Sequence, residues 1–536
     1  LVCHGMILVE QDVRGKMLSE GTFVDVRPRA ASRDDPKAID ESTDAWDTID
    51  WLVKNAPGNN GKVGIWGNSY PGFYAAQALI GGHPALVAAS PQAPVTDWFL
   101  GDDFHHNGAL FLADTVLFFG NFGKPRPQPV PKMLWDWDPE RGDLYDFFLG
   151  LGTLANINKT LFHDEIPFWN DMLAHPNRDA WWQARDPRPH LKKVTAAVLT
   201  VGGWFDAEDL WGTLETYRAI EAGSLGARNA VVIGPWRHGG WLRTDGASLG
   251  DIAFGAPTTR DYQNRLIVPF FLHHLKGEGP APTAEASVFE TGTNVWRSFG
   301  QWPPAEVKAQ ELFLAEGEQL AVQRAESAGR DRYVSDPRRP VPYRAAPSSH
   351  RGPEYMVDDQ RFAAHRPDVL VYTGAPLEDE WTVAGPIDAE LWVATAAGDA
   401  DFVVKVIDVW PANAKDSNPN PRDVRLGGYQ QLIRAEVMRG RFRNDFSKPE
   451  PFVRNQPARV ALRLPDVLHT FRAGHRLMVQ IQSSWFPLVD RNPQTFVEIA
   501  KATEADFQPA TIEVLRGGAQ ASKLKVGVLR GAWPRP

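Results

Sequence analysis

The sequence predicts an α/β fold with a β-rich C-terminal part, and three observations lead to this prediction. Residues 1–96 and 191–304 alternate apolar strand-like runs with amphipathic helical stretches, which is typical of a parallel sheet covered by helices. Residues 97–190 interrupt this alternation with Trp, Phe and Pro clusters. Residues 305–536 consist of short strands broken by Pro, Gly and Asp. We therefore expect two parts of one α/β domain, an inserted helical cap between them, and a C-terminal β jelly roll.

The elements of the first α/β part follow from the hydrophobic spacing. Residues 6–9 are a short apolar run, as in a buried parallel strand, and residues 43–54 place apolar side chains three and four positions apart, which predicts a helix. Residues 62–66 form a second strand-like run, and an Ala-rich helix is predicted over 72–80. The turn between this strand and this helix is the first place where a catalytic group is expected.

The same patterns place the later elements. The cap carries two amphipathic helix candidates, 141–156 and 166–184. Strand and helix alternation then resumes in the second α/β part, with elements over 196–201, 210–222, 230–233 and 259–276. The clearest strands of the C-terminal part are 368–374, 381–396 and 401–410.

Length and composition limit the classes of protein that fit. A chain of 536 residues has room for roughly two to four domains, and its 43% apolar and 23% charged residues are ordinary for a globular protein. The net charge of −9 provides no basic surface for nucleic acid, and no apolar run approaches the roughly 18 residues of a membrane span. The single cysteine, Cys3, excludes an internal disulfide and a Cys-based zinc site. The first residues lack the charged and apolar regions of a signal peptide.

The turn at residues 67–72, Gly-Asn-Ser-Tyr-Pro-Gly, lies between a predicted strand and a predicted helix. A nucleophile elbow has this context, because the tight turn holds a serine hydroxyl above the edge of the sheet. The backbone N–H of Tyr70, at the start of the helix, can donate to a developing oxyanion. Pro71 delays the second glycine of the usual motif to Gly72, and a helix tolerates proline in its first turn. A Gly-x-Ser turn alone is common, so Ser69 needs partners before it can be assigned as a nucleophile.

Two further polar residues follow predicted strands. Asp206 comes after the strand over 196–201, and His238 comes after the strand over 230–233. Catalytic groups of open α/β sheets lie just beyond the carboxyl ends of strands, and the order Ser, Asp, His is that of the α/β-hydrolase fold. Taken singly, Asp206 could cap the following helix and His238 could be an ordinary loop histidine. Together they predict a serine hydrolase in which Ser69 is the nucleophile, Asp206 the orienting acid and His238 the general base.

Acidic residues cluster near these positions. Asp102 and Asp103 open the cap insertion, and Glu208 and Asp209 closely follow Asp206. Carboxylates that border an acyl-transfer site repel one another, so a cation is a natural occupant. The alternative that stays open is helix N-capping for Glu208 and Asp209 and solvated surface for Asp102 and Asp103.

Two histidine pairs, 105–106 and 273–274, raise the question of a metal site. Adjacent residues on a helix point in different directions, and no third ligand stands at a fitting spacing. The sequence therefore predicts no metal and no cofactor.

Several segments together resemble those of a known superfamily. They are Gln-Asp-Val-Arg-Gly-Lys at 11–16, Ser-Glu-Gly at 19–21, the turn at 67–72, Gly-Asp-Asp at 101–103, Gly-Pro-Trp-Arg-His at 234–238, and the stretches 333–337, 474–480 and 483–492. Over nearly its whole length the chain resembles the cocaine-esterase and X-Pro dipeptidyl-peptidase superfamily, and within it the α-amino acid ester hydrolases.

This resemblance implies an α/β-hydrolase domain with a helical cap and a jelly roll, and it implies the same catalytic triad. It further implies that Asp103, Glu208 and Asp209 hold the α-ammonium group of the substrate. The partner is then a small-molecule α-amino acid ester, amide or α-amino β-lactam, whose acyl group passes to water or to an amine. The relatives imply a periplasmic or secreted location, and a homo-oligomer is left open.

Two departures from the family's pattern affect the site. The second oxyanion donor of these relatives is a Tyr hydroxyl upstream of the 11–16 segment, and this sequence does not contain it. We therefore expect the natural protein to extend further toward the N-terminus, with any signal peptide in that extension. Met17 stands where the ester hydrolases carry Tyr, which affects the substrate preference.

Two other functions are compatible with the same residues. An X-Pro dipeptidyl-peptidase or a cocaine-esterase-like carboxylesterase would use the same triad, and N-blocked substrates would distinguish it. From another class, an inactive hydrolase part with a binding jelly roll also fits. Failure of a fluorophosphonate to label Ser69 would favour that function.

Overall fold

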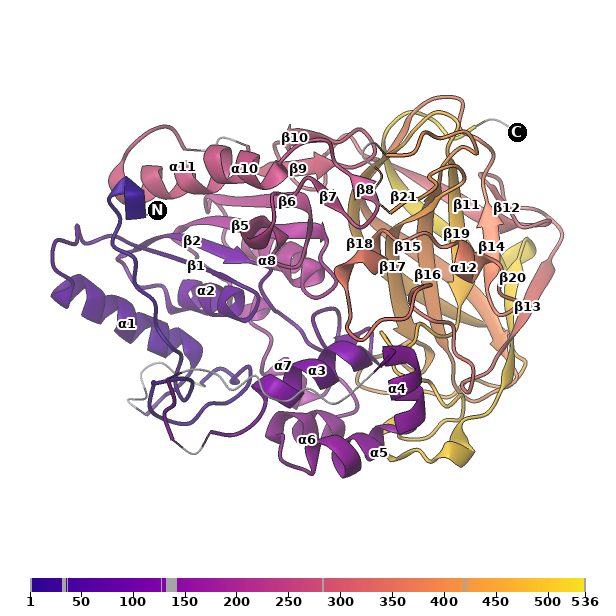
Figure 1. Cartoon of the computed structure of the whole chain (residues 1–536), viewed down its shortest axis with the longest axis horizontal. Coiled ribbons are helices and arrows are strands. Elements are labelled where there is room, and N and C mark those ends of the chain that lie inside the picture. The colour runs from indigo at the N-terminus through magenta and orange to yellow at the C-terminus, as the bar shows by residue number, and fades with distance from the viewer. Residues whose placement is uncertain are drawn as a thin grey trace.

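The computed structural model describes all residues except 1, 31–34, 36, 127, 132–141, 282–283, 418–419, 421 and 535–536. An α/β part and an all-β part lie side by side, and a group of helices lies below both in the view of Figure 1. This group, called the cap below, consists of α3 (Leu112–Phe122), α4 (Leu144–Leu151), α5 (Leu154–Ile157), α6 (Pro167–Ala174) and α7 (Ala180–Gln183).

The central sheet of the α/β part has six strands in the order β1-β2-β5-β6-β9-β10. They are β1 (Val63–Asn68), β2 (Leu86–Gln92), β5 (Ala197–Phe205), β6 (Asn229–Arg237), β9 (Ala286–Glu290) and β10 (Val295–Phe299). All neighbours pair in parallel except β10, which is antiparallel to β9. The strands predicted at 62–66, 196–201 and 230–233 are confirmed. Strands β2, β9 and β10 were not predicted, because residues such as Ala, Ser, Pro and Glu interrupt their apolar pattern.

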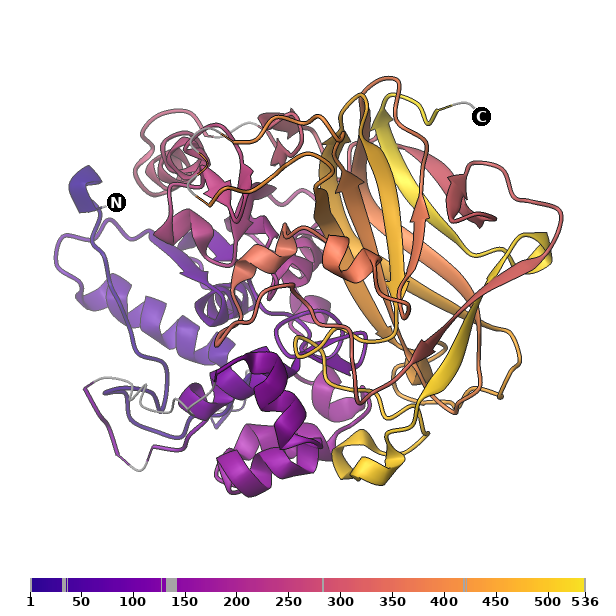
Figure 2. The same cartoon turned by 45° about the vertical axis from the view of Figure 1, so that its right-hand side comes forward.

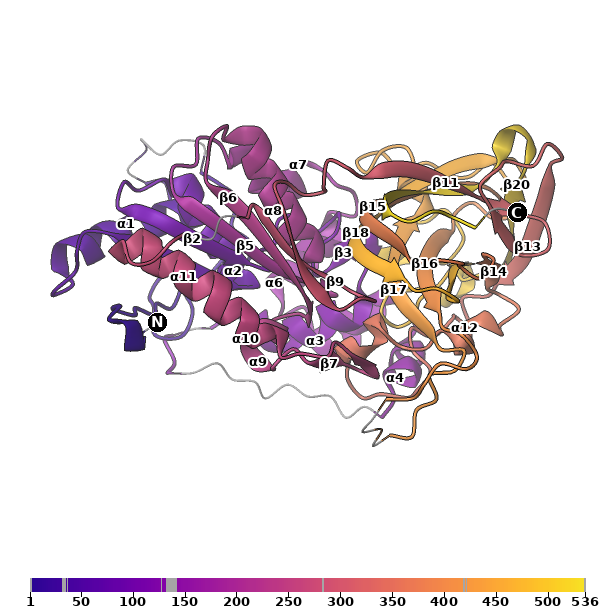
Figure 3. The same ribbon diagram turned by 90° about the horizontal axis from the view of Figure 1, so that it is seen from above.

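Helices cover both faces of this sheet (Figure 3). One face carries α1 (Glu41–Asn55), α2 (Tyr70–Gly81) and α8 (Leu210–Gly223), and the other carries the helical segment 258–276, which includes α10 (Thr258–Tyr262) and α11 (Val268–Phe271). Alternate side chains of β5 serve the two faces: Val198 packs with the first group and Leu199 with the second. The four predicted helices of the α/β part are therefore confirmed. In the described part of the chain, no helix is long and apolar enough to cross a membrane.

The cap helices are shorter than predicted. The candidate at 141–156 becomes α4 and α5, which are separated by Gly152 at a φ of 81°, and residue 141 lies outside the described residues. The candidate at 166–184 becomes α6 and α7, separated by a segment that contains Pro176. Glycine with a positive φ and proline both end a helix, so one amphipathic pattern spans two helices in each case.

Residues 6–9 do not form the predicted strand. Ile7, Leu8 and Val9 are 56%, 51% and 48% exposed, and β1 is the edge strand of the sheet, paired only with β2. A strand needs a neighbour for its backbone hydrogen bonds, and none lies beside this run in the described structure. The apolar pattern alone was therefore insufficient.

The C-terminal part is all-β, and the strands predicted at 368–374, 381–396 and 401–410 are confirmed as β14, β15 and β16. Its eleven-stranded sheet consists of β11 (Lys308–Ala315), β12 (Gln319–Ala321), β13 (Gly329–Ser335), β14 (Leu370–Thr373), β15 (Trp381–Thr395), β16 (Asp401–Val409), β17 (Gln430–Arg439), β18 (Ala458–Phe471), β19 (Arg476–Gln482), β20 (Ala510–Arg516) and β21 (Lys523–Arg530). Its finer assignment as a jelly roll stays a prediction. Short elements elsewhere are β3 (His105–His106), β4 (Ala109–Leu110), β7 (Ser248–Leu249), β8 (Ile252–Ala253), α9 (Gly240–Arg243) and α12 (Arg361–Ala364).

The α/β part and the all-β part share one apolar core, and Figure 2 shows them packed against each other. Trp204 at the end of β5 belongs to the same buried cluster as Leu432 of β17. The guanidinium of Arg434 donates to the carbonyl oxygen of Trp204 at 2.7 Å, and Arg218 of α8 pairs with the buried Asp466 of β18 at 2.7 Å. These contacts fix the all-β part against the carboxyl end of β5 and against α8.

Candidate active site

Ser69 lies in the tight turn between β1 and α2. Its backbone has a φ of 67° and a ψ of −128°, a conformation that non-glycine residues adopt only where the surrounding structure imposes it. The N–H of Ser69 donates to the carbonyl oxygen of Gln92 at 2.9 Å, and the N–H of Phe73 donates to that of Ser69 at 3.0 Å. The serine is thus held at the carboxyl end of β1, as the sequence predicts.

Both glycines of the turn are required by close backbone contacts. A Cβ on Gly67 would lie 2.3 Å from the carbonyl oxygen of Pro71, and one on Gly72 would lie 2.4 Å from that of Gln92. Pro71 stands in the first turn of α2, where its missing N–H costs no hydrogen bond. The delayed glycine is therefore explained by the approach of α2 to β2.

Asp206 follows β5 and His238 follows β6, so both stand at the same edge of the sheet as Ser69. Nδ1 of His238 lies 3.0 Å from both carboxyl oxygens of Asp206. Asp206 also accepts the N–H groups of Glu208 and Asp209 at 2.9 and 3.0 Å. Burial raises the pKa of Asp206, but the charge of His238 and these hydrogen bonds outweigh it and hold the pKa below its ordinary value. Asp206 therefore both orients the imidazole and caps the turn before α8.

The loops that carry Ser69 and His238 touch. A Cβ on Gly239 would lie 2.9 Å from Oδ1 of Asn68, so the direct neighbours of the two residues are in contact. Within the described part of the chain, no hydrogen bond joins Ser69 to His238. Nε2 of His238 instead lies 3.3 Å from a carboxyl oxygen of Glu208.

Asp103, Glu208 and Asp209 meet around this imidazole. The N–H of Asp103 donates to the carbonyl oxygen of Glu208 at 3.0 Å, and Nε1 of Trp98 donates to the carboxyl group of Asp103 at 2.8 Å. A carboxyl oxygen of Asp209 lies 3.7 Å from Nδ1 of His238. The structure thus brings all three predicted acids into one cluster, called the acid cluster below.

The charges of the acid cluster are poorly balanced. Asp209 is fully buried, and neither of its carboxyl oxygens accepts a hydrogen bond from a described residue. Burial and the charge of Asp103 raise the pKa of Asp209 well above its ordinary value, and burial and the charge of Glu208 raise that of Asp103 to about 8. Burial lowers the pKa of His238, but Asp206 and Glu208 raise it to about 9. Asp103 and Asp209 therefore hold their protons to a higher pH than ordinary carboxyl groups do.

The alternative of surface and capping roles is wrong for Asp102, Asp103 and Asp209. Asp102 is fully buried and accepts hydrogen bonds from Thr96 and from the N–H of Gly212, so it ties the loop after β2 to α8. Asp103 is largely buried, and Asp209 stands at the N-cap of α8 without making a capping hydrogen bond.

Tyr70 begins α2, so its N–H is among those that have no partner within the helix. Its side chain is anchored, because its hydroxyl accepts the N–H of Val26 at 2.6 Å and lies 3.4 Å from Asp25. Burial raises the pKa of Asp25 to about 7. Sequence reasoning identified the N–H of Tyr70 but not the anchor that holds it.

Sequence reasoning also missed Arg351, which reaches the site from the all-β part. Its Nη2 donates to Oε1 of Glu208, and its Nε donates to Oδ1 of Asp114 on α3. Arg351 lies 143 residues from Glu208 in a segment without a motif or periodic pattern. Only the packing of the two parts brings it here, so no sequence signal could have found it.

The two histidine pairs have separate partners. Nδ1 of His105 lies 2.9 Å from the carbonyl oxygen of Trp98, and Nδ1 of His106 lies 3.0 Å from a carboxyl oxygen of Glu436. Nδ1 of His273 lies 2.9 Å from the carbonyl oxygen of Gly279. Across the described residues, no group of three or more His, Cys, Asp or Glu side chains is placed so that it could hold a metal ion.

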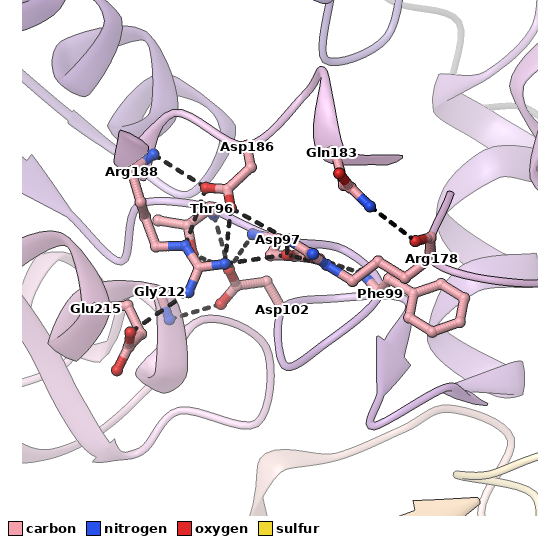
Figure 4. A network of polar contacts seen from close by, with 10 residues as sticks. All are labelled: Thr96, Asp97, Phe99, Asp102, Arg178, Gln183, Asp186, Arg188, Gly212 and Glu215. Atoms are coloured by element: carbon pink, nitrogen blue, oxygen red, sulfur yellow. Dashed lines mark hydrogen bonds and ion pairs between the residues drawn. The ribbon is translucent and has the colours of Figure 1, made fainter. Parts of the chain in front are cut away.

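A second set of buried charges includes Asp97, which belongs to the same loop after β2 as Asp103 (Figure 4). Asp97 accepts hydrogen bonds from Arg178 at 2.6 Å and from Arg188 at 3.1 Å. Asp186 accepts from the same two guanidinium groups, at 3.3 Å and 2.7 Å. In this set, called the ionic network below, each carboxylate has two cationic partners.

Comparisons with known proteins agree with this geometry. A family model described as X-Pro dipeptidyl-peptidase (S15 family) matches residues 1–240, and one described as the X-Pro dipeptidyl-peptidase C-terminal non-catalytic domain matches residues 279–525. Cocaine esterase of Rhodococcus sp. (strain MB1 Bresler) is 27% identical over 99% of this chain and 89% of the esterase.

Two solved structures are similar over most of their length. An aminopeptidase from the marine sediment archaeon Thaumarchaeota archaeon has a TM-score of 0.90 and 37% identity, covering 97% of this chain and 85% of that one. An α-amino acid ester hydrolase has a TM-score of 0.88 and 36% identity, covering 96% of this chain and 84% of that one. The resemblance found in the sequence motifs is confirmed. The chain belongs to the S15 and cocaine-esterase superfamily, and it is a serine hydrolase with an α/β-hydrolase domain and a C-terminal all-β domain.

Proposed function

We propose that the protein hydrolyses esters and amides whose acyl group carries a free α-ammonium group. The observation that carries this proposal is the fully buried carboxyl group of Asp209, which has no hydrogen-bond partner among the described residues and lies with two further acids beside His238. A bound ammonium group supplies the missing cation. It relieves the repulsion within the acid cluster and allows Asp209 to ionise.

The proposed chemistry is a double displacement. Ser69 attacks the acyl carbon while Nε2 of His238 takes its proton, and Asp206 holds the imidazole in the required tautomer. The N–H of Tyr70 donates to the oxyanion. The alcohol or amine leaves with the proton from His238, and an acyl-enzyme on Ser69 remains. Water, deprotonated by His238, then releases the acid, or an amine acceptor takes the acyl group instead.

The similar structures support a free amine on the substrate. One is named an aminopeptidase and the other an α-amino acid ester hydrolase, so we extend both reactions, on amides and on esters, to this chain. The same recognition covers α-amino β-lactams and acyl transfer to amines, because in these substrates too the ammonium group stands next to the reacting acyl carbon.

The test compares three methyl esters that differ only at the α-position: phenylalanine, N-acetylphenylalanine and 3-phenylpropanoate. A charge-assisted hydrogen bond contributes roughly 1.5–3 kcal/mol. The free amino ester should therefore have a kcat/KM about 10–100-fold above the other two. Equal values would indicate a general carboxylesterase.

Two further assays address the remaining alternatives. Faster cleavage of an X-Pro anilide than of an amino acid anilide would indicate a dipeptidyl-peptidase. Absence of fluorophosphonate labelling at Ser69 would indicate a binding protein with an inactive hydrolase part.

A further inference from the structure

Glu208 occupies an unusual position for a substrate-binding acid. One of its carboxyl oxygens lies 3.3 Å from Nε2 of His238, the atom that must take the proton of Ser69. Its other oxygen accepts a hydrogen bond from Arg351. Nδ1 of His238 is meanwhile bonded to Asp206. Both imidazole nitrogens therefore face carboxylates, which is an arrangement for an imidazolium ion and not for a free base.

Arg351 fixes Glu208 in this position. Its side chain is 11% exposed, and its second hydrogen bond runs to Asp114 of α3, so the guanidinium is held from two sides. The segment that carries it belongs to the all-β part, whose shared core with the α/β part prevents a free movement. Glu208 is thus anchored at one oxygen and presented to the imidazole at the other.

We propose that Glu208 gates the catalytic base. In the free enzyme Arg351 holds Glu208 across Nε2 of His238, and the substrate's α-ammonium group replaces the imidazolium as its partner, so that Nε2 becomes free for Ser69. This closed state of the free enzyme rests only on the contacts of Glu208 with His238 and with Arg351. The identity of the opening cation rests on the proposed function.

Most of the charged groups around His238 stabilise its protonated form. Asp206, Glu208 and Asp103 favour the protonated form of the imidazole, and a carboxyl oxygen of Asp209 lies 3.7 Å from its Nδ1. Arg351 is the cation that faces Glu208 from the all-β part, with Asp114 behind it on α3. An imidazolium cannot accept a proton, so under this proposal the free enzyme lacks its catalytic base below the pKa of His238, which is raised to about 9.

A bound ammonium group reverses this balance. It adds a second cation to the carboxylates that stabilise the imidazolium, and the proton on Nε2 passes to solvent. By linkage, the ammonium group binds more tightly to the enzyme in which His238 is neutral. A substrate with an amine thereby generates the base that attacks it, whereas a substrate without one meets a protonated imidazole.

The test is the pH dependence of hydrolysis for phenylalanine methyl ester and 3-phenylpropanoate methyl ester. The acidic limb of kcat/KM reports the free enzyme, and that of kcat reports the enzyme with substrate bound. For the amino ester, the limb of kcat should lie about 1–3 pH units below that of kcat/KM, the size of a shift caused by one neighbouring charge. For the desamino ester the two limbs should coincide.

The isosteric variant Glu208→Gln removes the charge and keeps the shape. Its kcat/KM limb should move down by about 1–3 pH units, and its two limbs should coincide for both esters. The matched control Glu513→Gln removes a surface carboxylate that pairs with Arg330 on the all-β part, and it should behave as the wild type. Phenylalaninol binding, measured by calorimetry in buffers of different ionisation enthalpy, should release more protons in the wild type, where both His238 and Asp209 lose one, than in Glu208→Gln, where only Asp209 does. This measurement requires no turnover.

Coinciding limbs for the amino ester in the wild type, or an unmoved kcat/KM limb in Glu208→Gln, would overturn the gate. If the amino ester is still preferred in that case, the proposed function survives without the gate. If the two esters have equal kcat/KM, the proposed function fails and the ammonium group is not the opening cation. A downward shift in Glu208→Gln would then still support the closed pair.

Discussion

Two sets of buried carboxyl groups each include a residue of the loop after β2, Asp97 in one and Asp103 in the other, and their hydrogen bonding differs. In the ionic network, Asp97 and Asp186 each accept hydrogen bonds from Arg178 and Arg188 (Figure 4). In the acid cluster, Asp209 is equally buried and accepts no hydrogen bond from any described residue. Both sets are buried beside the same loop, so burial alone does not explain the difference.

The difference indicates what each set is for. A buried carboxylate that only supports the fold is paired, because an unpaired buried charge costs several kcal/mol. The ionic network follows this rule and ties the cap to the loop that carries Asp103. The acid cluster departs from it beside the imidazole of His238, where a cationic substrate group can complete it. Substitutions in each set separate structural from substrate-binding acids.

The largest effect is expected at the proposed triad. Ser69→Ala and His238→Ala should each reduce kcat by about 10⁴–10⁶, and the double variant should be little worse, because triad members act as a unit. The measurement is steady-state hydrolysis of the free amino ester, with circular dichroism as the control for folding. Retention of a tenth of wild-type activity by Ser69→Ala would remove the triad assignment.

A structural effect is expected in the ionic network. Asp97→Ala leaves Arg178 and Arg188 short of a partner, and breaking a buried ion pair costs about 3–5 kcal/mol. The thermal unfolding midpoint should fall clearly, while the preference for the free amino ester over the desamino ester should not change in the folded enzyme. An unchanged midpoint would show that the network does not hold the cap, and a changed preference would erase the contrast between the two sets.

A substitution in the acid cluster should raise the thermal unfolding midpoint, by less than Asp97→Ala lowers it. The pKa of Asp209 is raised in the folded protein by burial and the charge of Asp103, so the folded state holds a proton that the unfolded state has released. The contribution of Asp209 to the free energy of unfolding therefore falls as the pH rises above the pKa of an aspartate in the unfolded chain, about 4. Asp209→Asn removes this loss. The thermal unfolding midpoint of the variant, relative to that of the wild type, should therefore rise between pH 5 and pH 8. A variant midpoint that decreases relative to the wild-type midpoint as the pH rises would contradict the raised pKa.

Local patterns predicted much of this molecule, and the failures have a common cause. Ser69, Asp206 and His238 each follow a strand, and the parallel order of β1, β5 and β6 brings strand ends together regardless of the intervening sequence. Residues 6–9 show the limit, since an apolar run becomes a strand only beside another strand. The contact of Glu208 with Arg351 likewise depends on tertiary packing and not on a local pattern.

Neighbouring positions in the sequence did not predict the partners of the acidic side chains. Asp102 and Asp103 are neighbours, yet one is bonded to backbone N–H groups of two elements and the other faces the imidazole. The partner of Glu208 comes from a different domain, so its charge environment depends on the packing of two parts. No residue spacing encodes such a contact.

The most direct test of the account is the change in substrate preference caused by Asp209→Asn. The quantity is the ratio of kcat/KM for phenylalanine methyl ester to that for 3-phenylpropanoate methyl ester, measured in the wild type, in Asp209→Asn and in the matched Asp97→Asn variant. Loss of one charge-assisted hydrogen bond to the ammonium group should lower the ratio about 10–100-fold in Asp209→Asn. In Asp97→Asn the ratio should stay at the wild-type value. An unchanged ratio in Asp209→Asn would show that this acid does not recognise the α-ammonium group, and the proposed specificity would have to be abandoned.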